Sequence, residues 1–126
     1  KTVYANHTED SLGFIIIIDS IKIYFTGDTS LDSKLYTIKD ENVDIVVACI
    51  NGKYDNLNIH EAIELYNNIS AKQIIPMHYG LIPSNRVKEN DFVQACAQSG
   101  VDYTILKTEK DYFIYKDKGI TIKERI

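Results

Sequence analysis

The sequence predicts an α+β fold in which a β-sheet is flanked by helices. Two observations support this prediction. Runs rich in β-branched and aromatic residues, such as 14–18 and 21–25, alternate with segments whose apolar residues recur at helical spacing. The 126 residues are 44% hydrophobic and 25% charged, close to the averages of globular domains, and no Pro/Gly/Ser-rich linker divides them. We therefore expect one unit with a core of its own.

The first predicted elements form a β-hairpin. Residues 13–28, GFIIIIDSIKIYFTGD, hold two β-rich runs on either side of Asp19 and Ser20, and both runs contain consecutive apolar residues. Such runs are expected in strands that are covered on both faces, so other parts of the protein should cover this hairpin. Apolar residues at helical spacing then predict a helix over 30–41, and residues 43–50 return to a buried strand.

The second half of the chain alternates helices and strands. Asn58 opens a helix over 58–69 and is followed three residues later by Glu61, which is the pattern of a capping box. The remaining elements, in chain order, are a short strand over 72–80 stopped by Pro76, a helix over 89–100 closed by Gly100, and strands over 101–107 and 112–116 with a turn through Glu109 and Lys110.

Composition argues against several classes of partner. The 14 Lys and Arg residues against 18 Asp and Glu residues give a net charge of −4, without the basic block that tracks a nucleic acid backbone. The longest apolar run, 14–18, is far shorter than the ~20 residues of a membrane helix, so we expect a soluble protein without a membrane partner. Cys49 and Cys96 lie in separate apolar segments and are expected as reduced core residues. With no secretory signal visible, a cytoplasmic protein is favoured.

Three residues stand at comparable places beside predicted strands. Asp28 follows one strand, His78 follows another, and His7 precedes the hairpin, so the three can meet at one edge of the sheet. Histidine and aspartate are ligands of zinc, manganese and iron. Taken singly, each also has an ordinary explanation: Asp28 can close the Gly-Asp-Thr turn, His78 can pack half-buried, and His7 can be exposed. Spacing alone leaves both interpretations open.

Two stretches, 6–30 and 44–80, resemble the later part of a metallo-β-lactamase-superfamily hydrolase, within it the L-ascorbate-6-phosphate lactonase branch. In that superfamily a histidine motif precedes a glycine-containing strand, a Gly-Asp-Thr carboxylate bridges two metals, and a last histidine follows a strand in a Pro-x-His segment. These features match His7, Asp28 and His78. The resemblance implies that His7 serves the first metal and His78 the second, with Asp28 touching both.

The resemblance also implies an αββα four-layer sandwich, of which residues 1–126 would be the C-terminal half. The family's first metal motif, His-x-His-x-Asp-His, does not occur, because the histidines are His7, His60 and His78. The missing ligands would come from an N-terminal half of the same protein or from a second copy in a homo-oligomer. A site without most of its ligands gains little from a metal, so the isolated chain is expected to be inactive.

For the intact protein the resemblance implies a metal-dependent hydrolase, with Asp28 and His78 as catalytic residues. Hydroxide bound to two zinc or manganese ions would open the lactone ring of a small phosphorylated substrate. One alternative is another hydrolase of the same superfamily, such as a phosphodiesterase or a nuclease. The other is a non-catalytic assembly module. Covalent catalysis is disfavoured because no Gly-x-Ser-x-Gly motif is present.

Several residues near the predicted ligands are candidates for binding the substrate. Thr29 and Tyr79 flank two ligands and could orient them or meet the substrate, and the loop with Asn51 and Gly52 could present backbone amides. Arg86, with Lys88 as the alternative, could reach an anionic group. Ordinary turn, packing or surface roles remain open for each of them. His60, in the first turn of a predicted helix, is expected at the surface.

Overall fold

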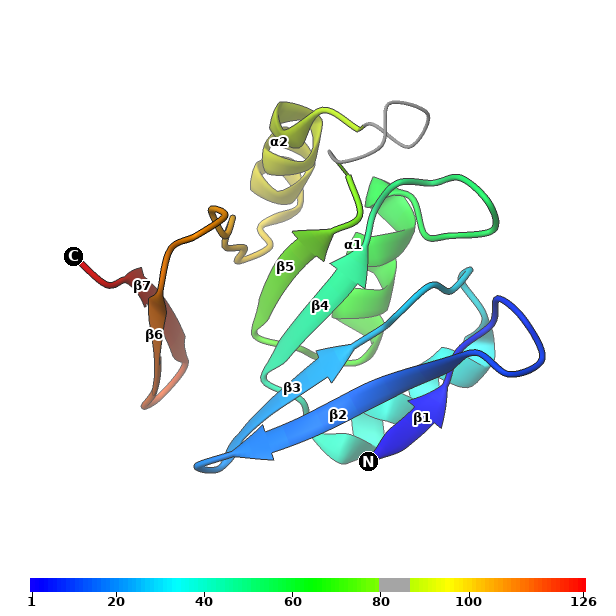
Figure 1. Cartoon of the computed structure of the whole chain (residues 1–126), viewed down its shortest axis with the longest axis horizontal. Coiled ribbons are helices and arrows are strands. Elements are labelled where there is room, and N and C mark those ends of the chain that lie inside the picture. The colour runs from blue at the N-terminus through cyan, green and yellow to red at the C-terminus, as the bar shows by residue number, and fades with distance from the viewer. Residues whose placement is uncertain (80–86) are drawn as a thin grey trace.

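The computed structural model describes residues 1–79 and 87–126 and contains a sheet flanked by helices (Figure 1), which confirms the predicted α+β class. In chain order the elements are β1 (Thr2–Tyr4), β2 (Leu12–Ile18), β3 (Ile21–Phe25), the 3-10 helix η1 (Ser33–Glu41), β4 (Ile45–Cys49), α1 (Ile59–Asn68), β5 (Gln73–Met77), α2 (Glu89–Ser99), β6 (Tyr112–Lys116) and β7 (Ile120–Glu124).

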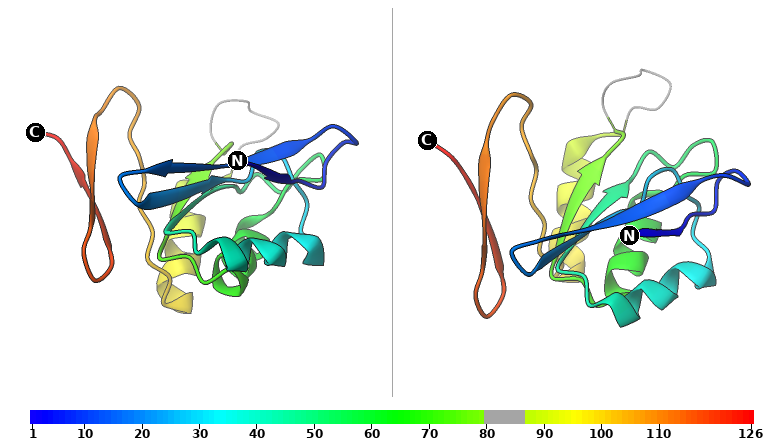
Figure 2. Two further views of the ribbon diagram at one scale, coloured as in Figure 1. Left: turned by 90° about the horizontal axis from the view of Figure 1, so that it is seen from below. Right: turned by 60° about the horizontal axis from the view of Figure 1, so that its bottom comes forward.

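Five strands form the main sheet in the order β1-β2-β3-β4-β5. The pairs β1/β2 and β2/β3 are antiparallel, whereas β3, β4 and β5 run parallel and are connected through η1 and α1. Figure 2 shows η1, α1 and α2 together on one face of this sheet. Parallel strands place their carboxyl ends along the same edge, so the loops after β3, β4 and β5 are brought together there.

The core lies between the sheet and the helices. Tyr24, Val46 and Ile74, from three adjacent strands, are fully buried together with side chains of η1, α1 and α2. Both cysteines are buried free thiols, as predicted. In the described ranges no helix has the length and apolar character needed to cross a bilayer.

Two predicted helix boundaries are confirmed. The side chain of Asn58 accepts a hydrogen bond of 2.8 Å from the Glu61 amide, and the Glu61 carboxylate accepts one of 3.0 Å from the Asn58 amide, which completes the capping box of α1. Gly100 closes α2 with a left-handed φ of 66°. The segment predicted as a helix over 30–41 is the 3-10 helix η1, whose N-cap Asp32 accepts a hydrogen bond from the Lys34 amide.

The prediction that the hairpin is covered on both faces is wrong for the described residues. Of the alternate residues on the helix side of β2, Gly13 and Ile15 are buried, whereas Ile17 near the end of the strand is 61% exposed. The outward-facing residues remain exposed because no described element lies over them: Leu12 is 51% exposed, Phe14 48%, Ile16 43% and Ile18 57%. The sheet therefore presents an apolar outer face made of three aliphatic side chains and Phe14, and we call these four residues the aliphatic outer face.

Three strand predictions also differ from the structure. Segment 101–107 is not a strand: Tyr103 makes one isolated bridge to Ile74, after which the chain leaves the sheet. Strand β6 is present but pairs with β7, so residues 117–119 form its turn rather than the predicted residues 109–110. Pro76 lies inside β5, opposite Ala48, instead of ending it, because an outer strand tolerates a missing N–H that faces away from its neighbour. β1 and β7 were not predicted.

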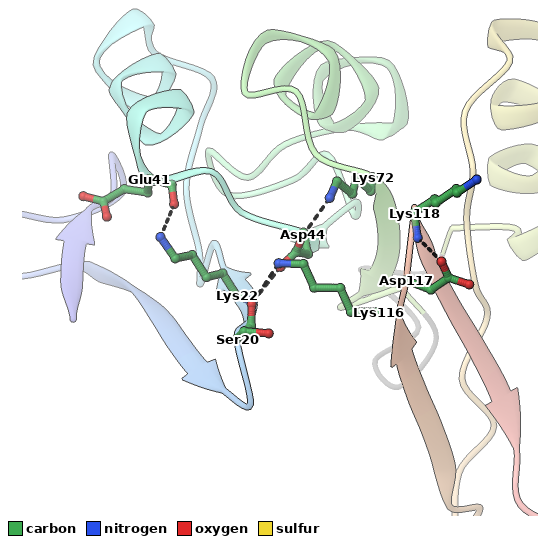
Figure 3. A network of polar contacts seen from close by, with 8 residues as sticks. All are labelled: Ser20, Lys22, Glu41, Asp44, Lys72, Lys116, Asp117 and Lys118. Atoms are coloured by element: carbon green, nitrogen blue, oxygen red, sulfur yellow. Dashed lines mark hydrogen bonds and ion pairs between the residues drawn. The ribbon is translucent and has the colours of Figure 1, made fainter.

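A buried carboxylate connects the C-terminal hairpin to the sheet (Figure 3). The Asp44 side chain, 2% exposed, accepts hydrogen bonds from the Lys22 amide at 2.9 Å and from Lys116 Nζ at 3.2 Å, and Lys72 Nζ lies 3.2 Å from its other oxygen. Lys116 Nζ also donates to the Ser20 carbonyl. Burial acts to raise the pKa of Asp44, but the Lys22 amide and the two ammonium groups outweigh it and leave this pKa below its usual value.

We expect Asp44→Asn to lower the free energy of unfolding by about 2 to 3 kcal/mol at neutral pH, because it removes a carboxylate that accepts charge-assisted hydrogen bonds. A lowered folded-state pKa stabilises the fold above the unfolded-state pKa of about 4, and this contribution is lost as pH falls through the folded-state value. In urea denaturation followed by circular dichroism, the difference between wild type and variant should therefore shrink in acid. The matched control is Asp40→Asn, at an exposed position of η1. An equal loss in the control, or a pH-independent difference, would contradict this interpretation.

Candidate functional site

The loops that follow β3 and β5 bring two of the predicted ligands together. Asp28 lies three residues after β3, and His78 directly follows β5. Asp28 Oδ1 and His78 Nδ1 are 2.9 Å apart, and the two side chains are 43% and 50% exposed. The contact spans the end of β4, which lies between the two strands in the sheet. This pairing agrees with the expectation that the two strand ends meet at one edge.

The backbone of His78 is unusual for a residue with a side chain. Its φ of 57° lies in the left-handed region, which ends β5 at this residue and sets the direction in which the imidazole leaves the strand. Such conformations cost free energy and persist only where surrounding structure holds them. The conformation of His78 is thus part of what brings its Nδ1 atom to Asp28.

Asp28 and His7 each have a buried atom that lacks a hydrogen-bond partner. Asp28 Oδ1 is buried and accepts no hydrogen bond, although His78 Nδ1 lies 2.9 Å away. His7, on the loop between β1 and β2, has a buried Nδ1 atom without a partner, and it lines a cavity of about 520 Å³. Unpaired carboxylate oxygen and imidazole nitrogen atoms fit a divalent metal ion. However, no three His, Cys, Asp or Glu side chains within residues 1–79 and 87–126 are grouped so that they could hold one.

Two glycines bring the turn with Asp28 against β2. A Cβ atom at Gly27, whose φ is 61°, would lie 2.9 Å from the Leu12 carbonyl oxygen. A Cβ atom at Gly13 would lie 2.9 Å from the Phe25 carbonyl oxygen. Real side chains do not approach this closely, so both positions need glycine for the backbones to be this near. The close approach fixes where the chain turns toward Asp28.

Thr29 and Tyr79, which flank the two ligands, both point into the protein. Thr29 is fully buried, and its Oγ1 atom accepts from the Asn6 amide and donates to the Ser30 carbonyl, which favours the predicted role of orienting the ligands over direct contact with the substrate. Tyr79 is half-buried, and its hydroxyl donates to Glu89 at 3.2 Å. Burial, with the nearby Glu89 carboxylate, raises the pKa of Tyr79. Both side chains therefore support the loops around the site.

The loop after β4 lines a second cavity, of about 540 Å³, together with the start of α1 and one face of α2. Asn51 is 5% exposed and its Oδ1 atom lacks a partner. The Gly52 amide already donates to the Leu57 carbonyl, so it is not presented to a ligand as predicted. His60 is exposed, as expected, and lines the same cavity. The volume is in the range of small-molecule sites.

The remaining predicted contacts are not tested by the structure. Arg86 lies outside the described residues, and Lys88 is exposed at the N-cap of α2. The sequence did not predict the hydrogen bonds between Asn6 and Ser30, which join the loop of His7 to the loop that carries Asp28. Nothing in the sequence signals these bonds, because they join residues 24 positions apart.

Comparisons with known proteins point to one family. The family described as the beta-lactamase superfamily domain matches residues 2–78, a range that includes all three predicted ligands. The chain is 30% identical over 102 residues to a UPF0173 metal-dependent hydrolase of Archaeoglobus fulgidus, and 30% identical over 100 residues to one of Alkaliphilus metalliredigens. Each alignment covers 79% of this chain.

Among solved structures, Igni18, a metallo hydrolase from the archaeon Ignicoccus hospitalis, superposes with a TM-score of 0.74 at 25% identity. That superposition covers 84% of this chain and 48% of Igni18. The alignments with the two UPF0173 relatives cover 44% of each relative. The chain thus spans about half the length of the proteins that it matches.

We expect Gly27→Ala to destabilise the chain more than Gly100→Ala, although both glycines have a φ near 60°. Alanine at either position pays about 1 to 2 kcal/mol for the left-handed backbone, whereas at Gly27 the clash with Leu12 adds about 1 to 3 kcal/mol. A Cβ atom at Gly100 meets nothing within 4 Å. Urea denaturation of the two variants measures the difference. Equal losses would mean that the turn relaxes without cost and does not need the close approach.

Proposed function

Since this chain belongs to the beta-lactamase superfamily domain family, we propose that it contributes His7, Asp28 and His78 to the metal centre of a metal-dependent hydrolase. The observation that carries the proposal is the 2.9 Å approach of Asp28 Oδ1 to His78 Nδ1, made by a buried carboxylate oxygen that accepts no hydrogen bond. A buried carboxylate oxygen that accepts no hydrogen bond costs free energy, and a cation at this position would remove the cost. The names of the relatives, metal-dependent hydrolases, support the same conclusion.

The most specific form of this proposal is an L-ascorbate-6-phosphate lactonase that uses zinc or manganese. When bound, two divalent ions supply an acidified water and polarise the carbonyl group of the lactone. The residues of this chain that would hold the ions are His7, Asp28 and His78. Asn51, which lines the 540 Å³ cavity, has a buried Oδ1 atom without a hydrogen bond, and a small movement of this side chain would offer that acceptor to a sugar hydroxyl. Lys88 is exposed at the N-cap of α2, the helix that forms one wall of that cavity, and its ammonium group would bind the phosphate of the substrate.

Two alternative functions are another hydrolase activity at the same metal centre and a non-catalytic role in assembly. A phosphodiesterase or nuclease of the same superfamily would use the same metal centre, although the net charge of −4 does not favour a long nucleic acid. A non-catalytic assembly module would use the aliphatic outer face of β2, where four apolar side chains lie exposed side by side. A panel of lactone, phosphodiester and RNA substrates separates lactonase activity from phosphodiesterase and nuclease activity.

We further propose that a complementary half covers the aliphatic outer face and supplies the remaining metal ligands. It would come from the same protein, completing a four-layer αββα sandwich, or from a second copy. The exposed residues Leu12, Phe14, Ile16 and Ile18 support this proposal, as does the half-length match to the relatives. Without that half, the chain should be inactive toward all substrates in the panel.

The test of the metal centre must tolerate weak binding, because this chain carries only part of the ligand set. We expect substoichiometric Mn²⁺ to broaden the NMR resonances around His7, Asp28 and His78 selectively, because paramagnetic broadening reports even a briefly occupied site. The Asp28→Ala/His78→Ala variant should lose this effect, and His60→Ala, at an exposed histidine on α1, should keep it. Broadening that the double variant retains, or that spreads over the acidic surface, would contradict the proposal.

Light scattering tests the proposed cover of the sheet. We expect the chain alone to self-associate, and Ile16→Lys to shift it toward the monomer by placing a charge on the aliphatic outer face. The matched control is Leu106→Lys, because Leu106 is also 43% exposed but lies outside that face. A wild-type chain that stays monomeric at high concentration would contradict the proposal that another half of the protein or a second copy covers this face.

A further inference from the structure

A hydrogen-bonded cluster joins the loop of His7 to the loop of Asp28. The Asn6 amide donates to Thr29 Oγ1 and the Asn6 side chain donates to Ser30 Oγ, both at 2.9 Å. In return, the Asn6 carbonyl accepts from Ser30 Oγ at 3.0 Å and from the Ser30 amide at 2.8 Å. We call these three residues the Asn6 clasp. Four hydrogen bonds thus connect two loops that are far apart in the sequence.

Thr29 is the centre of the Asn6 clasp and connects it to a third loop. Its side chain is fully buried, and its hydroxyl both accepts from Asn6 and donates to the Ser30 carbonyl at 2.9 Å. Its own carbonyl accepts from the Leu57 amide at 2.8 Å and lies 3.7 Å from the Cys49 thiol. One residue therefore links the loops that follow β1, β3 and β4.

The clasp residues are direct neighbours of two proposed ligands. Asn6 precedes His7 in the chain, and Thr29 follows Asp28, so the hydrogen bonds act one peptide away from each ligand. Both ligands have a buried atom without a hydrogen bond: His7 Nδ1, and Asp28 Oδ1, which lies 2.9 Å from His78 Nδ1. Such atoms gain free energy by turning toward water, so their position has to be imposed by neighbouring bonds.

We propose that Thr29, acting through the Asn6 clasp, is a positioning residue that holds His7 and Asp28 at a fixed separation before a metal ion arrives. The metal part of this inference rests on the proposed function. The Thr29 side chain does not touch the ion or the substrate. Its hydroxyl keeps two loops together, so that binding a cation does not have to order them.

The first test needs no metal. In amide hydrogen exchange of the whole chain, we expect Thr29→Val, which keeps the shape and removes the hydroxyl, to lower the protection of the Asn6 and Ser30 amides by about tenfold or more, with the β4 amides unchanged. Thr29→Ser should restore protection, because it returns the hydroxyl. Ser30→Ala, which removes a side chain that both donates and accepts, is a second variant with a smaller change in buried volume. Thr37→Val, at an exposed threonine of η1, is the control.

The second test measures Co²⁺ affinity from the visible absorption of the bound ion. We expect Thr29→Val to weaken binding by about 10- to 100-fold, the range for residues that orient metal ligands, with Thr29→Ser near wild type and Thr37→Val unchanged. Unchanged affinity in Thr29→Val, or a loss that Thr29→Ser fails to restore, would overturn the positioning role. If wild type shows no selective Mn²⁺ or Co²⁺ binding, the proposed function fails and the metal-positioning role fails with it. The exchange result alone then decides whether the clasp holds the loops.

Discussion

The position of Asp44 at the start of β4 is the constraint on which the arrangement of the parallel strands depends. Its amide donates to the Lys22 carbonyl on β3, and its carbonyl accepts from the Lys72 and Gln73 amides at the start of β5. One residue thereby sets the relative heights of three strands that are each five residues long. Ile45 pairs with Ile23 of β3 and with Gln73 of β5, so β4 and β5 end level and β3 ends two residues earlier. The contact between Asp28 and His78 at the far edge follows from that alignment.

The two ends of the parallel strands are held by different kinds of interaction. At the amino ends, the buried carboxylate of Asp44 is balanced by two ammonium groups. At the carboxyl ends, the Asn6 clasp uses only neutral groups. A cationic side chain in place of the clasp would neutralise Asp28 and weaken its attraction for a metal ion. Neutral hydrogen bonds position the loops and leave the charge of Asp28 available.

Local sequence signals, and the rule that parallel strands end at the same edge of a sheet, made part of this structure predictable. The capping box of α1 and the contact of Asp28 with His78 follow from residues close in sequence or from the shared edge of parallel strands. The open face of β2 was not predictable, because an apolar residue at every position does not tell which face is covered. Segment 101–107 has a strand composition but makes one bridge. The bonds between Asn6 and Thr29 depend on loop conformations that composition does not encode.

The short length of β1 has a consequence for the order of folding. β1 pairs with only Leu12, Gly13 and Phe14 of β2, so in the described chain the backbone edge beyond Ile15 has no neighbouring strand. A hairpin such as β2–β3 closes within about 1 to 10 μs, whereas the parallel strands wait for longer loops to close. The end of β2 beyond Ile15, where a strand of another protein can pair, thus forms early and keeps an unpaired backbone edge in the described chain. Asp19 and Lys22 lie at the turn of this hairpin, and their charges disfavour pairing of that edge with a strand of another protein.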